Sequence, residues 1–283
     1  MVSCYEMPTS LDEALNCLSS TDWTILSGGT DFYPSQLGAF RDVNVLDISH
    51  IASLKRIEKR PDQSVFIGSL STWTDIIKAD LPTGFEGLKL AAKEVGSVQI
   101  QNRGTVVGNI CNASPAADGV PPLLTLGAVV EIGSIRGNRK VALEKFILGN
   151  RKTDIHKDEM VIGIEIPAKE TLGISDFLKL GARHYLVISI AMIATRFVLD
   201  DNGKIVDAKI AVGSCSEVAR RLKILEEELK GQPYSSKLSH LIESRHFDCL
   251  TPIDDVRASK DYRMRAGQEI VARSFHALSK GFG

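Results

Sequence analysis

Short apolar stretches between polar turns run through the first 170 residues and predict alternating strands and helices. Ser10 and Glu13 have the spacing of a capping box, which predicts a helix through about Ser19. Thr72 and Asp75 repeat that spacing and predict a second, short helix. Further strands are predicted at residues 23–27, 43–47, 64–68 and 128–133, and further helices at residues 84–94 and 121–126. Residues 104–118 show neither a strand nor a helix pattern of apolar positions, and they are predicted to form a loop of small residues.

The pattern changes after residues 168–175, which we predict to be a domain boundary. Strands at residues 160–167, 177–181, 189–199 and 204–212 are followed by helices at residues 216–230, 235–244 and 261–279. Asn202-Gly203 predicts a type I′ hairpin turn, because Asn and Gly accept positive φ angles. In the last helix a buried stripe is expected from Tyr262, Ala266, Ile270, Ala272 and Phe275. Strands followed by helices indicate an α+β C-terminal domain.

Composition adds few constraints to this picture. The chain has 283 residues, 43% hydrophobic and 24% charged, with a formal net charge of −1. This balance gives no reason to expect nucleic acid as a partner. The longest apolar run is far below the roughly 20 residues that span a bilayer, and the chain opens without a secretory pattern. We therefore expect a cytoplasmic protein without a membrane span. The five cysteines are scattered, so no metal site is predicted.

Two glycine-bearing segments are candidates for binding a cofactor. In the first, Gly28-Gly29 ends an apolar strand, and glycines let the backbone turn sharply and approach a ligand closely. Successive N–H groups there can bind anionic oxygens, and Thr30 adds a hydroxyl. Adjacent glycines are also common in ordinary tight turns.

The second segment, residues 103–118, carries several small, hydrogen-bonding side chains. Ser114-Pro115 has the pattern of an N-cap followed by proline at the first helical position, and a helix start attracts anions. Asp118 is a carboxylate that accepts hydrogen bonds, so it suits a sugar or ribityl hydroxyl; simple stabilisation of a helix dipole is the alternative. Neither segment is a G-x-G-x-x-G or P-loop motif. Together they indicate a diphosphate held from two sides.

These residues resemble a known family. Residues 27–31, Ser-Gly-Gly-Thr-Asp, are similar to the first diphosphate-binding segment of the FAD-binding (medium) subunit of molybdenum hydroxylases of the xanthine dehydrogenase and carbon monoxide dehydrogenase type. Residues 99–109 and 113–118 resemble that family's longest motif, and residues 261–267 resemble the start of its last helix. The resemblance extends over nearly the whole chain.

The resemblance implies an α+β fold. A two-lobed FAD-binding domain of the vanillyl-alcohol oxidase (PCMH) type would occupy residues 1–170, with lobes at about 1–55 and 56–170. An α+β C-terminal flavoprotein domain, an antiparallel sheet with helices, would follow at residues 171–283. The implied FAD-binding residues are Leu26, Ser27, Gly28, Gly29, Thr30, Asp31, Thr105, Gly108, Asn109, Ser114, Asp118, Val161 and Lys179.

Within that set the resemblance implies different roles. Asp118 would bond a ribityl or ribose hydroxyl, and Val161 would lie near the adenine or the flavin edge. Lys179 would stabilise negative charge on a reduced flavin, although surface lysines on strands are common. The chain departs from the family at Val107, where many relatives have glycine, and after Arg183, where an acidic residue often stands.

The resemblance also implies electron transfer, with no catalytic side chain in this subunit. Electrons would pass from 2Fe–2S clusters of a small partner chain through FAD to NAD+ or another acceptor, while a large molybdopterin-binding subunit oxidises the substrate. The chain has no C-x4-C-x2-C run for such clusters. Two alternatives remain open at this point: a stand-alone flavin reductase of the same fold, and a scaffold subunit that has lost FAD.

Overall fold

A three-stranded parallel sheet forms the first lobe of the computed structural model, which describes residues 2–35 and 43–280. Its order is β1 (Val2–Glu6), β3 (Val43–Asp47), β2 (Thr24–Leu26). Helix α1 (Leu11–Ser20) connects β1 to β2, and the capping box of Ser10 and Glu13 is confirmed. The short helix α2 (Phe32–Ser35) follows the loop after β2.

A five-stranded antiparallel sheet forms the second lobe. Its order is β4 (Ile57–Lys59), β5 (Val65–Gly68), β10 (Met160–Ile166), β6 (Val129–Ser134), β7 (Gly137–Ala142). The helices of this lobe are α3 (Trp73–Lys78), α4 (Glu86–Glu94), α5 (Val98–Gln101), α6 (Val106–Asn112), α7 (Val120–Thr125) and α8 (Leu143–Phe146). A small hairpin, β8 (Ile147–Gly149) and β9 (Lys152–Thr153), follows α8.

Strand β10 joins the two lobes through its buried side chains. Met160 and Ile162 pack with Leu15 and Leu18 of α1 in the first lobe. Val161, in contrast, belongs to the core of the second lobe. Opposite faces of a strand alternate along the sequence, so this almost wholly apolar strand contributes to both cores. The lobes therefore share one strand between their hydrophobic cores.

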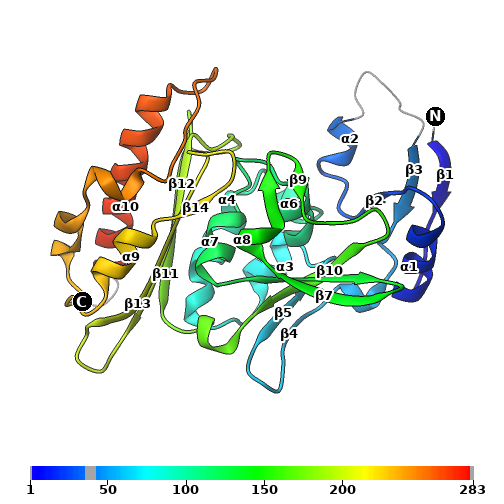
Figure 1. The fold of residues 1–283 in the computed structure, drawn as a ribbon, viewed down its shortest axis with the longest axis horizontal. Helices are drawn as coiled ribbons and strands as arrows, with labels where there is room; N and C mark the ends of the chain where they lie inside the picture. Colours follow the sequence, from blue (N-terminus) through cyan, green and yellow to red (C-terminus); the bar gives the residue numbers. More distant parts are fainter. Residues whose placement is uncertain (1, 36–42, 281–283) are drawn as a thin grey trace.

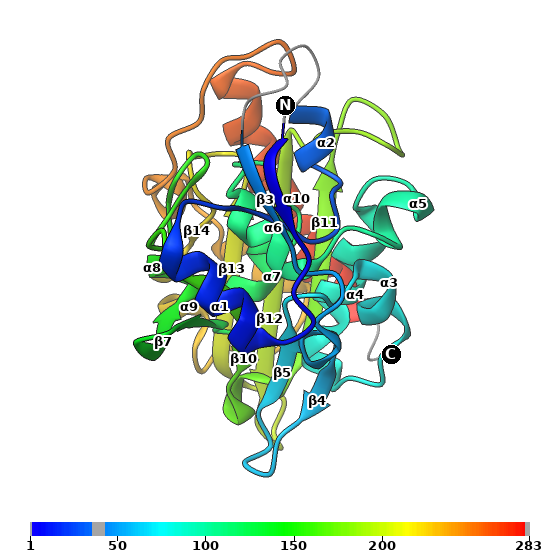
Figure 2. The same cartoon turned by 90° about the vertical axis from the view of Figure 1, so that its right-hand side faces the viewer.

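The C-terminal part is an antiparallel sheet between two layers of helices (Figure 1). The sheet order is β11 (Ile174–Leu180), β12 (Ala191–Leu199), β13 (Ile205–Gly213), β14 (Arg220–Arg221). Helices α9 (Lys223–Leu229) and α10 (Lys260–Lys280) cover one face. Helices α4 and α7 of the second lobe contact the other face. The view turned by 90° places β1, α1 and β3 in front, farthest from α10 (Figure 2).

Several local predictions were wrong. Residues 106–112 form helix α6 and not a loop, because Val106, Val107 and Ile110 are buried in the core and override poor helix propensity. The hairpin turn has Gly203 alone at positive φ, with Gly203 N–H bonded to Asp200 O, so it is a type I turn with a glycine bulge and not type I′. Strand β11 begins at Ile174, three residues before its predicted start.

The predicted C-terminal helices also need correction. The helix expected at residues 216–230 begins only at Lys223, because Arg220 and Arg221 pair with β13 instead. Residues 235–244 form a 3-10 helix, Ser236–Leu241, and not an α-helix. The helix α10 exists as predicted, but Tyr262 is 47% exposed and lies outside the buried stripe that Ile270 and Phe275 do form. No helix in the described ranges is long and apolar enough to cross a membrane.

Candidate functional site

The first glycine loop, residues 27–31, leaves β2 at the point where the two lobes meet. Gly29 has φ +73°, a conformation that favours glycine. At Gly28 the reason for glycine is a close contact: a Cβ there would lie 2.1 Å from the carbonyl oxygen of Arg103. The loop therefore packs directly against the backbone of the second segment, 75 residues later in the chain (28 to 103).

Thr105 organises the second segment as the N-cap of α6. Its Oγ1 accepts a hydrogen bond from the N–H of Gly108 at 2.9 Å. The same oxygen lies 3.4 Å from Ser27 Oγ of the first glycine loop. A Cβ on Gly108 would lie 2.8 Å from Thr105 Oγ1, so this helix turn also depends on a missing side chain. The structure brings together the two segments that the sequence predicted to share one ligand.

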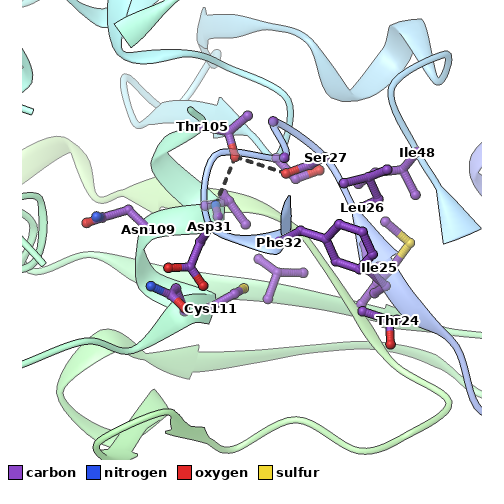
Figure 3. A pocket seen from close by; sticks show the side chains of 18 of the residues that line it. Thr24, Ile25, Leu26, Ser27, Asp31, Phe32, Ile48, Thr105, Asn109 and Cys111 are labelled. Atoms are coloured by element: carbon purple, nitrogen blue, oxygen red, sulfur yellow. Dashed lines mark hydrogen bonds between the residues drawn. The ribbon is translucent and has the colours of Figure 1, made fainter. Parts of the chain in front are cut away.

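A cavity of about 750 Å³ lies along these segments (Figure 3). Ser27 and Thr105 lie in the middle of the view, with Thr24, Ile25 and Ile48 on one side and Asp31 and Cys111 towards the other. The predicted site residues that line this cavity are Leu26, Ser27, Gly28, Gly29, Thr30, Asp31, Thr105, Gly108, Asn109 and Val161. Three predicted residues, Ser114, Asp118 and Lys179, are not part of this lining.

Sequence reasoning missed the apolar end of the cavity. Leu18, Trp23, Ile48, Ile155 and Met160 line it. They come from α1, β10 and the segments next to β2, β3 and β9, so no single sequence motif contains them. Apolar walls with a few placed polar groups are typical of sites for organic ligands, and a volume between about 300 and 1,000 Å³ is common for them. This end suits a flat, weakly polar ring system.

Ser114 does not begin a helix. Its Oγ accepts a hydrogen bond from Ala116 N–H, and its carbonyl accepts one from Ala117 N–H, which closes a single turn. The next helix, α7, starts only at Val120 with Gly119 as its N-cap. The expected N-cap followed by proline at the first helical position is therefore wrong, because the chain turns once and continues into a second turn that contains Asp118.

Asp118 and Lys179 form a buried ion pair between the turn before α7 and strand β11. Lys179 Nζ lies 2.5 Å from Asp118 Oδ2, and Ser189 Oγ donates to Asp118 Oδ1 at 2.5 Å. Both side chains are less than 10% exposed. Burial raises the pKa of Asp118, while the neighbouring ammonium of Lys179 opposes that shift. The pair is linked to the cavity through Asn109, whose Oδ1 accepts from Gly119 N–H at 3.3 Å.

The charged groups around the cavity are mostly paired. Arg139 holds the pKa of Glu159 at about 2, so this lining residue is anionic at neutral pH. Lys157 lies 2.5 Å from Asp22. Cys111 lines the cavity from α6, and the protein around it raises the pKa of its thiol. Among the described residues, no group of three His, Cys, Asp or Glu side chains could hold a metal ion.

Two lobes that enclose a partly apolar cavity at a pair of glycine-bearing segments form a site of the kind expected for a dinucleotide. Residues 1–169 match the family described as FAD binding domain in molybdopterin dehydrogenase, and residues 176–278 match the CO dehydrogenase flavoprotein C-terminal domain. The chain therefore belongs to the FAD-binding, medium subunits of the molybdenum hydroxylases of the xanthine dehydrogenase and carbon monoxide dehydrogenase type, as its sequence predicted. The predicted α+β fold class is confirmed as well.

Individual relatives span nearly the whole chain. The xanthine dehydrogenase FAD-binding subunit of Escherichia coli O157:H7 is 30% identical over 95% of this chain and 93% of its own length. The glyceraldehyde dehydrogenase medium chain of Sulfolobus acidocaldarius is 30% identical over 97% of this chain and 98% of its own. A carbon monoxide dehydrogenase structure from Hydrogenophaga pseudoflava has the same fold, with a TM-score of 0.87 at 24% identity over 98% of this chain and 97% of that one.

Proposed function

We propose that this chain binds FAD in the cavity, with the diphosphate between the first glycine loop and the first turn of α6. The observation that carries this proposal is the convergence of the two segments, with Ser27 and Thr105 only 3.4 Å apart. The missing Cβ at Gly28 lets the first glycine loop pack against the second segment, and the positive φ of Gly29 lets its backbone turn sharply there. Ser27, Thr30 and Thr105 offer hydroxyl donors to phosphate oxygens. The residues present therefore fit the group.

The individual residues would contact different parts of FAD. Residues 26–31 hold one side of the diphosphate, and Thr105, Gly108 and Asn109 hold the other. Val161 borders a ring, and Ser114 fixes the turn before Asp118. Both oxygens of Asp118 already accept one hydrogen bond, and a carboxylate has room for about four. We therefore propose that Asp118 also accepts a ribityl or ribose hydroxyl while it holds Lys179 near the flavin.

The bound flavin would supply the redox chemistry, and the chain would supply position and charge. We propose that the chain receives electrons from 2Fe–2S clusters of a small partner subunit and delivers them to NAD+ or another acceptor. A large molybdopterin-binding subunit would oxidise the substrate. Relatives described as medium chains support such an assembly, since a medium chain implies a larger and a smaller one. Residues 1–170 would form the FAD-binding domain, and residues 171–283 the C-terminal domain.

Binding of FAD is the first prediction. The purified chain, alone or with its partners, is expected to be yellow or to become yellow after incubation with FAD and gel filtration. Its visible flavin absorbance should bleach on addition of dithionite. Because the grip on a diphosphate is the central feature, FAD should be retained in preference to FMN from an equimolar mixture. A protein that stays colourless after incubation with FAD would refute the proposed function and favour a scaffold role.

The second prediction concerns Asp118→Asn, which keeps the shape of the side chain and removes its charge. We expect the dissociation constant for FAD to rise roughly ten- to hundredfold, since a hydrogen bond to a charged group contributes roughly 1.5–3 kcal/mol. A titration that follows the quenching of flavin fluorescence measures this change. The thermal midpoint should also fall, because the buried ammonium of Lys179 loses its counter-charge.

Ser189→Ala is the matched control for that variant. It removes the other partner of Asp118 and leaves both the carboxylate and Lys179 in place. We expect its affinity for FAD to stay within about threefold of the wild type, which is under 1 kcal/mol. Equal FAD affinity in Asp118→Asn and in the wild type would show that the carboxylate only ties the turn before α7 to β11.

A further inference from the structure

Arg151 occupies an unusual backbone conformation beside the cavity. It lies in the turn between β8 and β9 with φ +54°, a region that side-chain-bearing residues rarely adopt. Its N–H donates to the carbonyl oxygen of Ala113 at 2.9 Å, and Ala113 is itself left-handed at the C-terminal end of α6. Strained residues of this kind persist where the surrounding structure holds them, often at ligand sites. The turn is thus fixed onto the end of α6 that follows the second segment.

The side chain of Arg151 connects the two segments that border the cavity. Its Nη1 lies 2.9 Å from Asp31 Oδ2 of the first glycine loop, and its Nη2 lies 3.5 Å from Oδ1. Nη1 also donates to Asn112 Oδ1 at the end of α6. Asp31 and Asn112 both line the cavity. A guanidinium is therefore held at the edge of the cavity by one residue from each segment.

The charges around the cavity indicate why a cation is needed at the position of Arg151. A diphosphate carries negative charge, and Asp31 would place a carboxylate in the same loop that is proposed to hold it. Among the described lining residues, only His156 and Lys157 can become positive, and they lie beside Glu159 and Asp22 respectively. Without Arg151, Asp31 would repel the ligand. With 58% of its side chain exposed, Arg151 is not committed to a buried structural role.

We propose that Arg151 is the counter-charge for the diphosphate of the bound dinucleotide, and that Asp31 and Asn112 are positioning residues that aim its guanidinium at the cavity. This inference rests on the proposed binding of FAD. It assigns Asp31 a role through Arg151, since a carboxylate cannot donate a hydrogen bond to a phosphate. An exposed ion pair contributes little to stability, so the effect should be seen in binding and much less in folding.

The test is a double-mutant cycle on FAD affinity with Arg151→Gly, Asp31→Asn and the variant that combines them. Glycine accepts the left-handed conformation at residue 151, so this variant keeps the backbone of the turn. We expect Arg151→Gly to weaken FAD binding roughly ten- to hundredfold, the range for one lost charged contact. Adding Asp31→Asn should then restore part of the affinity, because the unopposed carboxylate is gone. Raising the salt concentration should narrow the difference between wild type and Arg151→Gly.

Whether Asp31→Asn raises or lowers the FAD affinity of the Arg151→Gly variant distinguishes a counter-charge from a purely structural ion pair. If the ion pair of Arg151 and Asp31 only connected the two segments structurally, the combined variant would bind FAD no better than Arg151→Gly. That result would overturn the proposal. Equal affinity in Arg151→Gly and wild type would overturn it as well. Failure of the wild-type chain to bind FAD at all would instead contradict the proposed function. Arg151→Lys provides a rescue variant, because it keeps the charge and should recover most of the affinity.

Discussion

Gly28→Ala is expected to lower the affinity for FAD at least about a hundredfold, which corresponds to roughly 3 kcal/mol. The new methyl group would lie 2.1 Å from the carbonyl oxygen and 2.9 Å from the carbonyl carbon of Arg103. These are backbone atoms, and they cannot move alone, because the next residue, Gly104, accepts a hydrogen bond from Trp73 N–H at 3.2 Å. The first glycine loop must therefore move away from the second segment. Titration of FAD against the purified variant measures the loss.

Gly267→Ala is the matched control, since it adds the same methyl group at another glycine. Gly267 lies in α10, where the nearest atom to an added Cβ is Cys215 Sγ at 3.9 Å, an ordinary contact. Alanine also favours a helix over glycine. This variant should bind FAD as the wild type does. Circular dichroism should show both variants folded, and unchanged FAD binding in a folded Gly28→Ala would disprove the role of the close contact.

The core of the site could be predicted from sequence because its signals are local. Gly28-Gly29 and Thr105 stand in short motifs whose chemistry needs those residue types, and the fold brings both motifs to one cavity. The helical form of residues 106–112 could not be predicted, because Val, Gly and Asn are weak helix formers and burial decided the outcome. Arg220 and Arg221 leave the predicted helix because they pair with Val212 and Ala211 of β13, a pairing that the pattern of residues 216–230 does not reveal.

Several contacts between distant segments could not be predicted from the sequence. Lys179 and Asp118 were each predicted near FAD, but their pairing across 61 residues depends on how α7 packs against the C-terminal sheet. The apolar end of the cavity likewise combines α1 with β10. No sequence motif pointed to Arg151, because its position beside the cavity depends on the turn that is hydrogen-bonded to Ala113. Local motifs predict which groups bind the cofactor. The packing of distant segments decides which apolar and charged side chains surround those groups.

Arg196→Ala is expected to destabilise the chain by about 3–5 kcal/mol, the range for breaking a buried ion pair. Arg196 on β12 is fully buried. Its Nε donates to Thr125 O of α7 at 2.9 Å, and its Nη1 donates to Leu172 O at 2.9 Å. Its Nη2 lies 2.6 Å from both Glu170 and Asp207. One side chain thus holds the C-terminal sheet, α7 and the segment between β10 and β11 together.

Loss of this guanidinium would remove positive charge from the buried carboxylate of Glu170 and from the partly exposed carboxylate of Asp207. Lys209 also pairs with Glu170, but its single ammonium group cannot replace the contacts of Arg196 with both Glu170 and Asp207. Urea unfolding of the FAD-free chain measures the effect without stabilisation by ligand. Arg273→Ala, which breaks an exposed pair with Glu269, should cost no more than about 0.5 kcal/mol. A loss of similar size in both variants would mean that Arg196 does not tie the C-terminal sheet to the lobe that carries α6 and the second segment.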